Sequence, residues 1–443
     1  MRILVWTAVV ALGLAASSVA VAQPAFPGAQ GFGAETRGGR GGRVIEVTNL
    51  NDAGAGSLRA AIEAAGPRIV VFRVAGTIQL ASDLRIRAPF ITIAGQSAPG
   101  GGVTLRDHPL IIEADEVIVR YIRSRLGDES HIESDAIWVA RGRNVMLDHV
   151  SASWSVDETL SVSQHEDPGP PVLDNVTVQW SIIAESLDHS IHSKGAHGYG
   201  SLVRGANGAR YSFVDNLWAH HHARMPRPGN YLGIDQDATG PLIEFVNNVF
   251  YNWGGDHAGY DADTNAAVRT NFIGNYYLAG PNSSVNTVAF QEQNAGAKAY
   301  FADNWWNGAA PADPWSLVRM QADNPDYRQA QPFSTPTIAQ SADAAFAAVL
   351  AQAGVSKSRE AVDARVVQSV RERNGRIIDS QRDVGGWPEL AAGAPYPDED
   401  HDGMSDDWER AHGLNPHDAR DGARMRADGY TNVEAFLNEL AAQ

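Results

Sequence analysis

Short apolar runs recur between residues 91 and 304 and are separated by segments rich in Gly, Asn and Asp. They are ITIAGQ (91), VIVRYI (117), VMLDHV (145), VTVQWS (176), YSFVDN (211), IEFVNN (243), TNFIGN (270) and AYFADN (299). Successive starts are 26 to 35 residues apart, unlike the roughly 8–12 of a β-sandwich or the roughly 40–45 of a propeller. A short constant core with connections of variable length predicts stacked rungs. We therefore expect an all-β, right-handed parallel β-helix with short flanking helices.

The last four runs each place asparagine at the sixth position: Asn216, Asn248, Asn275 and Asn304. Asparagine tolerates left-handed backbone conformations, and its amide can bond to the same residue on the next rung. Apolar or aromatic residues follow each asparagine. We expect an asparagine ladder beside continuous aromatic stacks.

The two ends of the chain differ from this repeat. Residues 1–22 combine Arg2, a short apolar run and Ala-Val-Ala, which predicts a signal peptide and a secreted protein, extracellular or periplasmic. No later segment has the roughly 20 apolar residues of a membrane span. We expect the β-helix at 23–340, a helical flank and linker at 341–394, and an acidic calcium-binding module at 395–443. The glycine-rich segment 31–62 lacks Gly-Lys-Ser/Thr and is expected to lead into a helix that caps the solenoid.

The formal net charge of −17 and the absence of cysteine limit the chemistry. Disulfides, thiolate metal sites and cysteine nucleophiles are excluded, and nucleic acid is repelled at long range. An acidic polymer would need local cations. The stretch AHHHARMPRPGNY (219–231) gathers Arg224, Arg227 and three histidines, and is therefore a candidate anion-binding segment.

Two motifs together resemble the pectate lyase family, the β-helical lyases that cleave polygalacturonate. They are DAIWVARGRNVMLDHVSASWSVDE (135–158) and RMPR (224–227). The resemblance runs from about residue 26 to 387, and GGRGG…VTNLND.G.GSLR (38–59) is similar to a bacterial exported subgroup. It implies a calcium-dependent pectate lyase that acts by β-elimination, forms 4,5-unsaturated oligogalacturonides and binds an acidic polysaccharide as a monomer.

The resemblance also implies the metal ligands. Asp135 and Asp157 match the family's calcium-binding elements, whereas Ser161 stands where the family has a further aspartate. Glu158 is a candidate replacement ligand. Carboxylate oxygens are the ligands that calcium prefers, and a cation at a uronate carboxylate would stabilise the charge that develops during elimination.

The substrate-binding residues come from the same resemblance. Lys194 corresponds to the family's substrate-binding lysine, Arg224 to its catalytic arginine and Arg227 to the second arginine of the motif. A further family arginine would fall at Gly229. Three alternatives stay open: a pectin lyase for methylated polymer, a glycoside hydrolase with Asp135 and Asp157 as acid and base, and a non-catalytic carbohydrate-binding solenoid.

Other histidines and tryptophans do not require a metal site or a catalytic role. Adjacent residues of a strand point to opposite faces, so His220–His222 predict turn or substrate contacts rather than one metal site. For His189, His192 and His197 we expect hydrogen bonds to sugar in the groove. For Trp138, Trp154 and Trp180 we expect packing in the core.

The acidic tail carries DEDHDGMSDDWE (398–409), which fits the calcium-loop pattern at every liganding position. The expected ligands are Asp398, Asp400, Asp402, Met404 through its carbonyl, Asp406 and Glu409. The preceding GAPYP cannot form an entering helix, so the loop is similar to those of dockerin-like or thrombospondin-type modules rather than to a full EF-hand. A second loop at 427–436 has Arg424 and Arg426 where acids would be expected.

Overall fold

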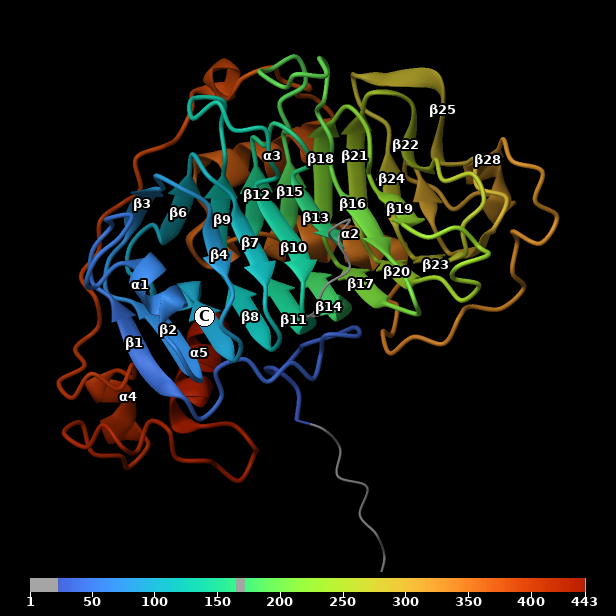
Figure 1. The fold of residues 1–443 in the computed structure, drawn as a ribbon. Coiled ribbons are helices and arrows are strands. Elements are labelled where there is room, and N and C mark those ends of the chain that lie inside the picture. The colour runs from blue at the N-terminus through green and yellow to red at the C-terminus, as the bar shows by residue number, and fades with distance from the viewer. Residues whose placement is uncertain (1–22, 165–171, 443) are drawn as a thin grey trace, which may run out of the picture.

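Three parallel sheets lie along one solenoid, so the predicted parallel β-helix is confirmed (Figure 1). The computed structural model describes residues 23–164 and 172–442, and the signal peptide predicted at 1–22 lies outside them. The ten-stranded sheet contains β1 (Arg43–Val47), β2 (Arg68–Phe72), β5 (Ile91–Ala94), β8 (Val117–Arg120), β11 (Arg143–Asp148), β14 (Asp174–Gln179), β17 (Arg210–Val214), β20 (Leu242–Val246), β23 (Val268–Ile273) and β26 (Ala297–Ala302).

The other sheets complete each rung. The nine-stranded sheet contains β3 (Gly76–Gln79), β6 (Val103–Arg106), β9 (Ile122–Arg125), β12 (Ser151–Ser153), β15 (Ile182–Ala184), β18 (Leu217–His221), β21 (Val249–Trp253), β24 (Tyr276–Leu278) and β27 (Trp305–Trp306). The six-stranded sheet contains β4 (Leu84–Ile86), β7 (Leu110–Glu113), β10 (Ile137–Arg141), β13 (Leu160–Ser163), β16 (Leu202–Gly205) and β19 (Arg227–Asn230). A three-stranded sheet contains β22 (Gly255–Asp261), β25 (Ser283–Glu292) and β28 (Val318–Met320).

The sequence repeat is the register of the ten-stranded sheet. Ile91 pairs with Val117, Val117 with Val145, and Val145 with Val176. The same residue of each later run continues the row, in the order Val176, Tyr211, Ile243, Thr270 and Ala299. The eight runs identified in the sequence are therefore eight consecutive strands of one sheet, aligned without a shift.

The asparagine ladder is also confirmed. The Nδ2 of Asn216 donates to Oδ1 of Asn248 at 3.0 Å, Asn248 to Asn275 at 3.1 Å, and Asn275 to Asn304 at 2.9 Å. The left-handed backbone conformation lies one residue earlier than the sequence suggested, for instance at Asp215 with φ 56°. The turn thus bends just before each asparagine, whose amide then satisfies backbone groups of the neighbouring rungs.

Aromatic stacks fill the space inside the coil. One stack runs through Phe213, Phe245, Phe272 and Phe301, with ring centroids 5.0–5.4 Å apart. A second runs through Trp218, Phe250 and Tyr277, at 4.9 and 4.8 Å. These side chains are buried in one continuous apolar core, whose burial is the main stabilising term for a chain without disulfides.

Helices cover the solenoid at its end and flank. The helices are α1 (Leu58–Glu63), α2 (Ala342–Gln352), α3 (Ala361–Glu372), α4 (Asp406–Ala411) and α5 (Asn432–Ala442), with 3₁₀ turns at Gly95–Ser97, Pro314–Leu317, Ser356–Ser358 and Gln381–Val384. Helix α1 contacts β1, β2 and β4, as expected of a cap. Helices α2 and α3 bury Val349, Val366 and Val370 against the outer face of the nine-stranded sheet (Figure 1).

The C-terminal residues return to the start of the solenoid. Met404, Val433 and Phe436 pack on Ile69 and Val71 of β2, and Figure 1 shows α5 next to β1, β2 and β8. This region therefore lies on the ten-stranded sheet. No helix in the described ranges is both long enough and apolar enough to cross a bilayer.

Candidate active site

The residues predicted to bind metal meet at the start of neighbouring strands. Asp135 precedes β10, whereas Asp157 and Glu158 precede β13. Strands β10 and β13 are paired in register, with Trp138 beside Ser161. Because neighbouring strands are about 4.8 Å apart, side chains at matching positions form rows across the outer face. The fold thus brings together residues more than 20 positions apart in sequence.

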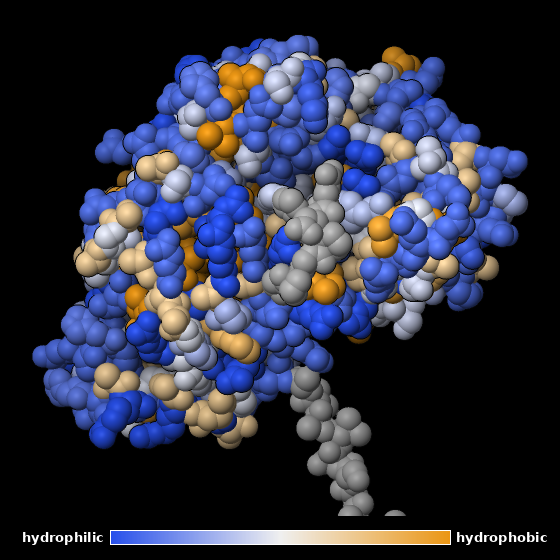
Figure 2. All heavy atoms as spheres, in the orientation of Figure 1, coloured by the Kyte–Doolittle hydropathy of each residue, from blue (hydrophilic) through white to orange (hydrophobic). Residues whose placement is uncertain are grey.

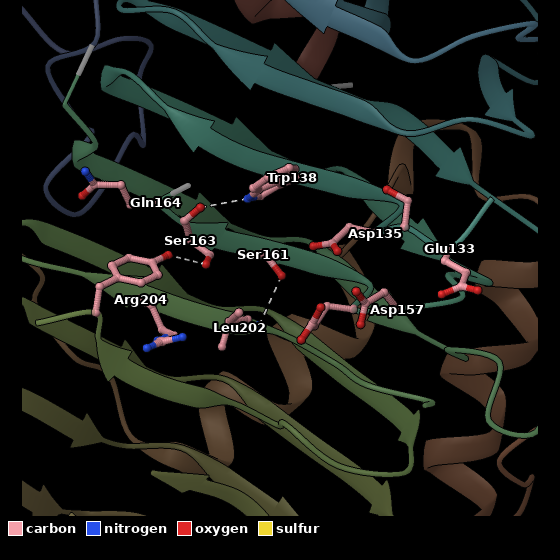
Figure 3. A pocket seen from close by; sticks show the side chains of 12 residues that line it. Glu133, Asp135, Trp138, Asp157, Ser161, Ser163, Gln164, Leu202 and Arg204 are labelled. Carbon is pink, nitrogen blue, oxygen red and sulfur yellow. Dashed lines mark hydrogen bonds between the residues drawn. The ribbon is translucent and has the colours of Figure 1, made fainter. Parts of the chain in front are cut away.

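Three carboxylates form one cluster in this row (Figure 3). One oxygen each of Asp135, Asp157 and Glu158 lies within 4.8 Å of the others. Asp135 and Glu158 are buried, whereas the Asp157 side chain is 31% exposed. Burial, followed by the negative charge of Asp157, raises the pKa of Asp135 well above its usual value, and a hydrogen bond with Ser161 partly offsets this rise. A bound cation would relieve the same concentration of negative charge, and three carboxylates fit calcium.

Arg224 lies against this cluster. Its guanidinium forms an ion pair with Glu158, its Nε donates to the hydroxyl of Tyr260 at 3.3 Å, and its Cζ lies 4.1 Å from the ring centroid of Tyr199. Tyr199 forms parallel bridges with both Glu158 and Ala223, which explains the meeting of the two charged residues. The predicted catalytic arginine and the predicted metal ligands therefore share one site.

The other two predicted substrate-binding residues lie at its margins. Arg227 begins β19, with its Nη2 3.7 Å from Asp263 Oδ1 and its Cζ 5.6 Å from the ring centroid of Tyr260. Lys194 is exposed in the connection between β15 and β16, and its backbone N–H donates to Nδ1 of His192 at 3.1 Å. Both cations are thus near the cluster without a contact to its carboxylates.

Two histidines hold Asp157 from the other side. The rings of His192 and His197 stack at 3.7 Å, and Nε2 of His197 lies 2.8 Å from Oδ1 of Asp157. Burial, opposed by the charge of Asp157, lowers the pKa of His197. Both rings are buried against a carboxylate, and the hydrogen bonds to sugar expected of them stay a prediction. His189 is exposed and lies 3.5 Å from Asp379.

Two histidines of the triplet, His220 and His221, have a structural role in β18. His220 is fully buried between Asn252 and Ser369, with ring nitrogen distances of 2.8 and 2.7 Å. His221, also buried, lies 2.7 Å from Ser186 Oγ and 2.9 Å from the carbonyl of Ile183. The two rings contact different partners, as the alternation of side chains in a strand requires.

His222 differs from its two neighbours. Its side chain is 47% exposed, and its Nδ1 lies 3.3 Å from Asp188. Substrate contact, one of the two predicted roles of the triplet, therefore does not apply to the buried His220 and His221.

A cleft of about 370 Å³ opens beside the carboxylates. Its walls include Glu133, Trp138, Gln164, Arg204 and Tyr231 (Figure 3). Figure 2 shows mainly hydrophilic side chains over this face of the molecule. The cleft is therefore open and polar, as the binding of a charged chain would require.

One tryptophan departs from the expected core position. Trp138 lines the cleft and donates to the carbonyl of Ser163 at 2.9 Å, so the core prediction is wrong for this residue. Trp154 is buried in the core, as predicted, and Trp180 is half-buried beside the ring of His149.

Arg204 is a cleft residue that sequence reasoning missed. It pairs in register with Gly229, the position at which the resemblance leaves an arginine absent. A Cβ atom at Gly229 would lie 2.6 Å from Asp263 Oδ2 and 3.3 Å from Arg204 Cγ, so the glycine leaves room for its neighbours. Arg204 stacks on Tyr231 at 4.5 Å and bonds to the Asn230 carbonyl at 3.1 Å. The rung alignment was the available signal, since it places β16 next to β19.

The predicted calcium loop of the tail forms a separate acidic cluster. Asp398, Asp400 and Asp402 form one close group, whereas Asp402 and Glu409 form another with Asp421, which the sequence reasoning did not include. The backbone N–H of Met404 donates to Asp402 at 3.0 Å.

Asp406 belongs to neither group of the tail. Its Oδ1 accepts the Glu399 N–H at 2.9 Å, and its Oδ2 lies 3.4 Å from Arg410. Asp406 thus closes the loop onto α4 in this structure, instead of joining the carboxylates with which it was predicted.

Comparison with known proteins gives relatives along almost the whole chain. The probable pectate lyase C of Aspergillus fumigatus is 36% identical over 441 residues, 97% of each chain. The probable pectate lyase C of Emericella nidulans is 35% identical over 433 residues, 95% of this chain and 93% of that protein. These relatives are fungal, so the bacterial subgroup stays a prediction. No family model matches the chain.

Solved structures agree on the fold. The cedar pollen allergen jun a 1 superposes with a TM-score of 0.50 and 18% identity, over 74% of this chain and 92% of that one. The thermostable pectate lyase PL 47 gives a TM-score of 0.51 and 14% identity, over 74% and 97%. At such identities these matches support the shared β-helix alone.

Proposed function

The chain belongs to the pectate lyase family and is therefore a polysaccharide lyase. From this premise we propose that it is a calcium-dependent pectate lyase that cleaves (1→4)-α-D-galacturonan by β-elimination and forms 4,5-unsaturated oligogalacturonides. One arrangement supports the proposal above all: Asp135, Asp157 and Glu158 gather beside Arg224 in an open cleft.

The reaction determines which charges the cleft has to supply. Elimination removes the proton on C5 of a galacturonate, beside its carboxylate. A C4–C5 double bond forms as the C4–O bond to the next sugar breaks, and the departing oxygen takes up a proton. Negative charge therefore builds up on a group that is already an anion. Fixed positive charge at the uronate carboxylate lowers the barrier to this step.

The carboxylate cluster fits a hard divalent cation. Calcium held by Asp135, Asp157 and Glu158 would supply Lewis-acid charge at the substrate carboxylate. Ser161 offers a neutral hydroxyl in place of a carboxylate and hydrogen-bonds Asp135. His197 occupies one oxygen of Asp157 at 2.8 Å and so orients its carboxylate.

Arg224 is the proposed base: its guanidinium would first lose one proton to solvent, and the neutral group would then accept the C5 proton. Tyr199, Tyr260 and Glu158 contact its guanidinium from three directions. A group held in this way loses little freedom when the substrate binds, which lowers the entropic part of the barrier. We assign Glu158 two roles, as a carboxylate of the cation cluster and as the partner that keeps Arg224 beside it.

Three further cations are proposed to bind uronate carboxylates along the chain of sugars. Arg204 lines the cleft, Arg227 lies on the adjacent strand β19, and Lys194 is exposed on the loop beside His197. Guanidinium–carboxylate contacts are directional and charge-assisted. These side chains therefore make an acidic polysaccharide a suitable ligand for a protein whose net charge is −17.

Secretion is part of the same proposal. Polygalacturonate is a polymer that does not cross membranes, so its depolymerase has to meet it outside the cytoplasm. The N-terminal residues 1–22 supply an export signal by sequence. Cleavage of the chain near residue 22 on export, measured by mass spectrometry of the mature protein, tests this point.

The test of the function compares two polymers and two products. The purified protein is incubated with polygalacturonate and with highly methylated pectin, each with calcium or with a chelator. We expect ultraviolet absorbance of an unsaturated product from polygalacturonate only when calcium is present. New reducing ends without that absorbance would indicate hydrolysis, and preference for methylated polymer would indicate a pectin lyase; either result contradicts the proposal.

A further inference from the structure

Five carboxylates of the C-terminal module converge away from the cleft. Asp398, Asp400 and Asp402 have ligand atoms within 4.8 Å of one another, and so do Asp402, Glu409 and Asp421. Asp402 belongs to both groups, which makes them one cluster. It lies beside α4, where the module meets the ten-stranded sheet, whereas the cleft lies on the six-stranded sheet.

Six oxygens of this cluster are buried and lack hydrogen-bond donors. Both carboxylate oxygens of Glu409, both of Asp400, Oδ2 of Asp402 and Oδ1 of Asp421 have no partner within the described residues. Glu409 is 0% exposed, Asp421 3% and Asp402 4%. An unpaired buried carboxylate is costly, so a group of them requires a compensating charge.

Basic side chains do not supply that charge. Arg73 lies 3.6 Å from Asp398 at one edge. Across residues 23–164 and 172–442, no ion pair joins Asp400, Asp402, Glu409 or Asp421 to an arginine, lysine or histidine. The side chain of Asp406 is already used by Glu399 and Arg410. The cluster therefore presents buried carboxylate oxygens that have neither a hydrogen-bond donor nor a basic partner.

We propose that this cluster binds one calcium ion and that Asp421 completes the site. The donors are carboxylate oxygens without nitrogen or sulfur, which favours a hard cation over a transition metal. Glu409 has both oxygens free for bidentate binding, and several carboxylates suit the 6–8 ligands of calcium better than the strict octahedron of magnesium. Asp421 takes the part that the loop pattern gave to Asp406.

The position of Asp421 gives the ion a structural role. The Oδ2 of Asp421 accepts the Asn415 N–H at 3.1 Å, and its carbonyl accepts Nδ2 of Asn432, the first residue of α5, at 2.9 Å. The ion would therefore join the loop before α4 to the segment that starts α5. Without it, like charges would repel within the layer that holds the module against β2.

Polar contacts also hold the docked module against the solenoid. Arg40 pairs with Glu434 at 2.9 Å, and Arg120 donates to Asn438 at 3.1 Å. Arg73 donates to the Tyr396 carbonyl at 2.7 Å, and His401 lies 3.0 Å from Glu46. Met404, Val433 and Phe436 add apolar contact. Calcium bound at Asp421 and Glu409 would therefore stabilise this module on the first rungs, independently of the reaction in the cleft.

The test uses the full mature chain carrying Asp135→Asn and Asp157→Asn, which removes the cleft cluster and with it the activity. Terbium luminescence, sensitised by Trp408 beside Glu409, reports binding, and calcium or magnesium is added as competitor. We expect one terbium ion per chain, displaced by calcium. Calcium should also raise the unfolding temperature and protect the chain after residue 395 from proteolysis.

A third substitution in the same background locates the site. Glu409→Gln should weaken terbium and calcium binding about a hundredfold, whereas Asp407→Asn, with its side chain 87% exposed, should leave both unchanged. Asp421→Asn gives a second reading if the glutamine variant does not fold. Absence of binding in the double variant, binding insensitive to Glu409 and Asp421, or magnesium competing as well as calcium would overturn the proposal. None of these results depends on whether the cleft cleaves pectate.

Discussion

Glu158 and Arg224, 66 positions apart in the sequence, form an ion pair in the row of residues that precedes β13 and β19. Tyr199 lies between them, and its backbone bridges Glu158 on one side and Ala223, the residue before Arg224, on the other. The pair joins the carboxylate cluster to the arginine, so a change at Glu158 should affect cation binding and catalysis together.

The first prediction concerns this pair. Glu158→Gln removes one of three carboxylates and leaves Arg224 without its ionic partner. We expect the calcium concentration for half-maximal activity to rise by about tenfold or more, with a lower kcat at saturating calcium. Rates measured over a calcium titration check this. Glu372→Gln, exposed on α3 and outside the cleft, is the control and should change neither value; equal effects of the two substitutions would show that Glu158 has no special role.

The second prediction concerns Arg204. Arg204→Ala removes a guanidinium from the cleft wall, and the loss of one charge-assisted contact costs about 1.5–3 kcal/mol, or roughly 10- to 150-fold in binding. We expect the increase in KM for polygalacturonate to exceed the decrease in kcat. Steady-state kinetics measure both. Arg210→Ala is the control, because Arg210 pairs with Asp174 on the ten-stranded sheet. An unchanged KM would remove Arg204 from the substrate site.

The third prediction concerns acid stability. Burial lowers the pKa of His220 from 6.5 to about 4 in the folded state. Below pH 6.5 the unfolded chain binds a proton at His220 that the folded chain does not bind. The stability that is present above pH 6.5 is therefore lost as the pH falls towards 4. The shift corresponds to roughly 3 kcal/mol. His220→Gln should be less stable at neutral pH, but should lose less stability on acidification in denaturant unfolding.

A neighbouring histidine supplies the control with the opposite sign. The hydrogen bond to Asp188 raises the pKa of His222. Its contribution is therefore full below pH 6.5 and is lost as the pH rises through the folded-state value. His222→Gln should cost more stability in acid than at neutral pH. Parallel pH dependence of the two variants would contradict both assignments.

The fourth prediction concerns the asparagine ladder. Asn248→Ala removes an amide that donates to Phe213 and Asn275 and accepts from the backbone and side chain of Asn216. Buried polar groups then lack partners, and we expect a loss of about 3–5 kcal/mol. Asn286→Ala, at an exposed position of β25, should cost less than about 1 kcal/mol. Similar unfolding midpoints for both variants would contradict a stabilising ladder.

The rungs were predictable because each one has to pair in register with the rung before it and the rung after it. A residue such as Val145 needs an equivalent partner above and below, so the sequence has to keep its register, and Val145 does pair with Val117 and Val176. The candidate site was predictable only where a motif falls on a rung. Asp135, Asp157 and Arg224 are held by strands whose stacking fixes their relation.

The parts of the sites that could not be predicted lie on connections between strands, whose lengths vary. His192 and His197 belong to the long loop between β15 and β16, and nothing in the repeat specifies that it folds back onto Asp157. Asp421 lies outside the twelve-residue loop pattern and reaches Glu409 only through the turn before α5. Arg204 lacks a motif of its own, and its role follows from the pairing of β16 with β19.

The central claim is that a cation cluster and Arg224 act on one uronate, and the most direct measurement is the initial rate of unsaturated-product formation from polygalacturonate. We compare the wild-type chain with Arg224→Lys, each with saturating calcium and with chelator. The account predicts a rapid rise in absorbance for the wild type that the chelator abolishes, and a loss of about 10²–10⁴-fold for Arg224→Lys even with calcium. An undiminished rate in Arg224→Lys, or in the wild type with chelator, would contradict it.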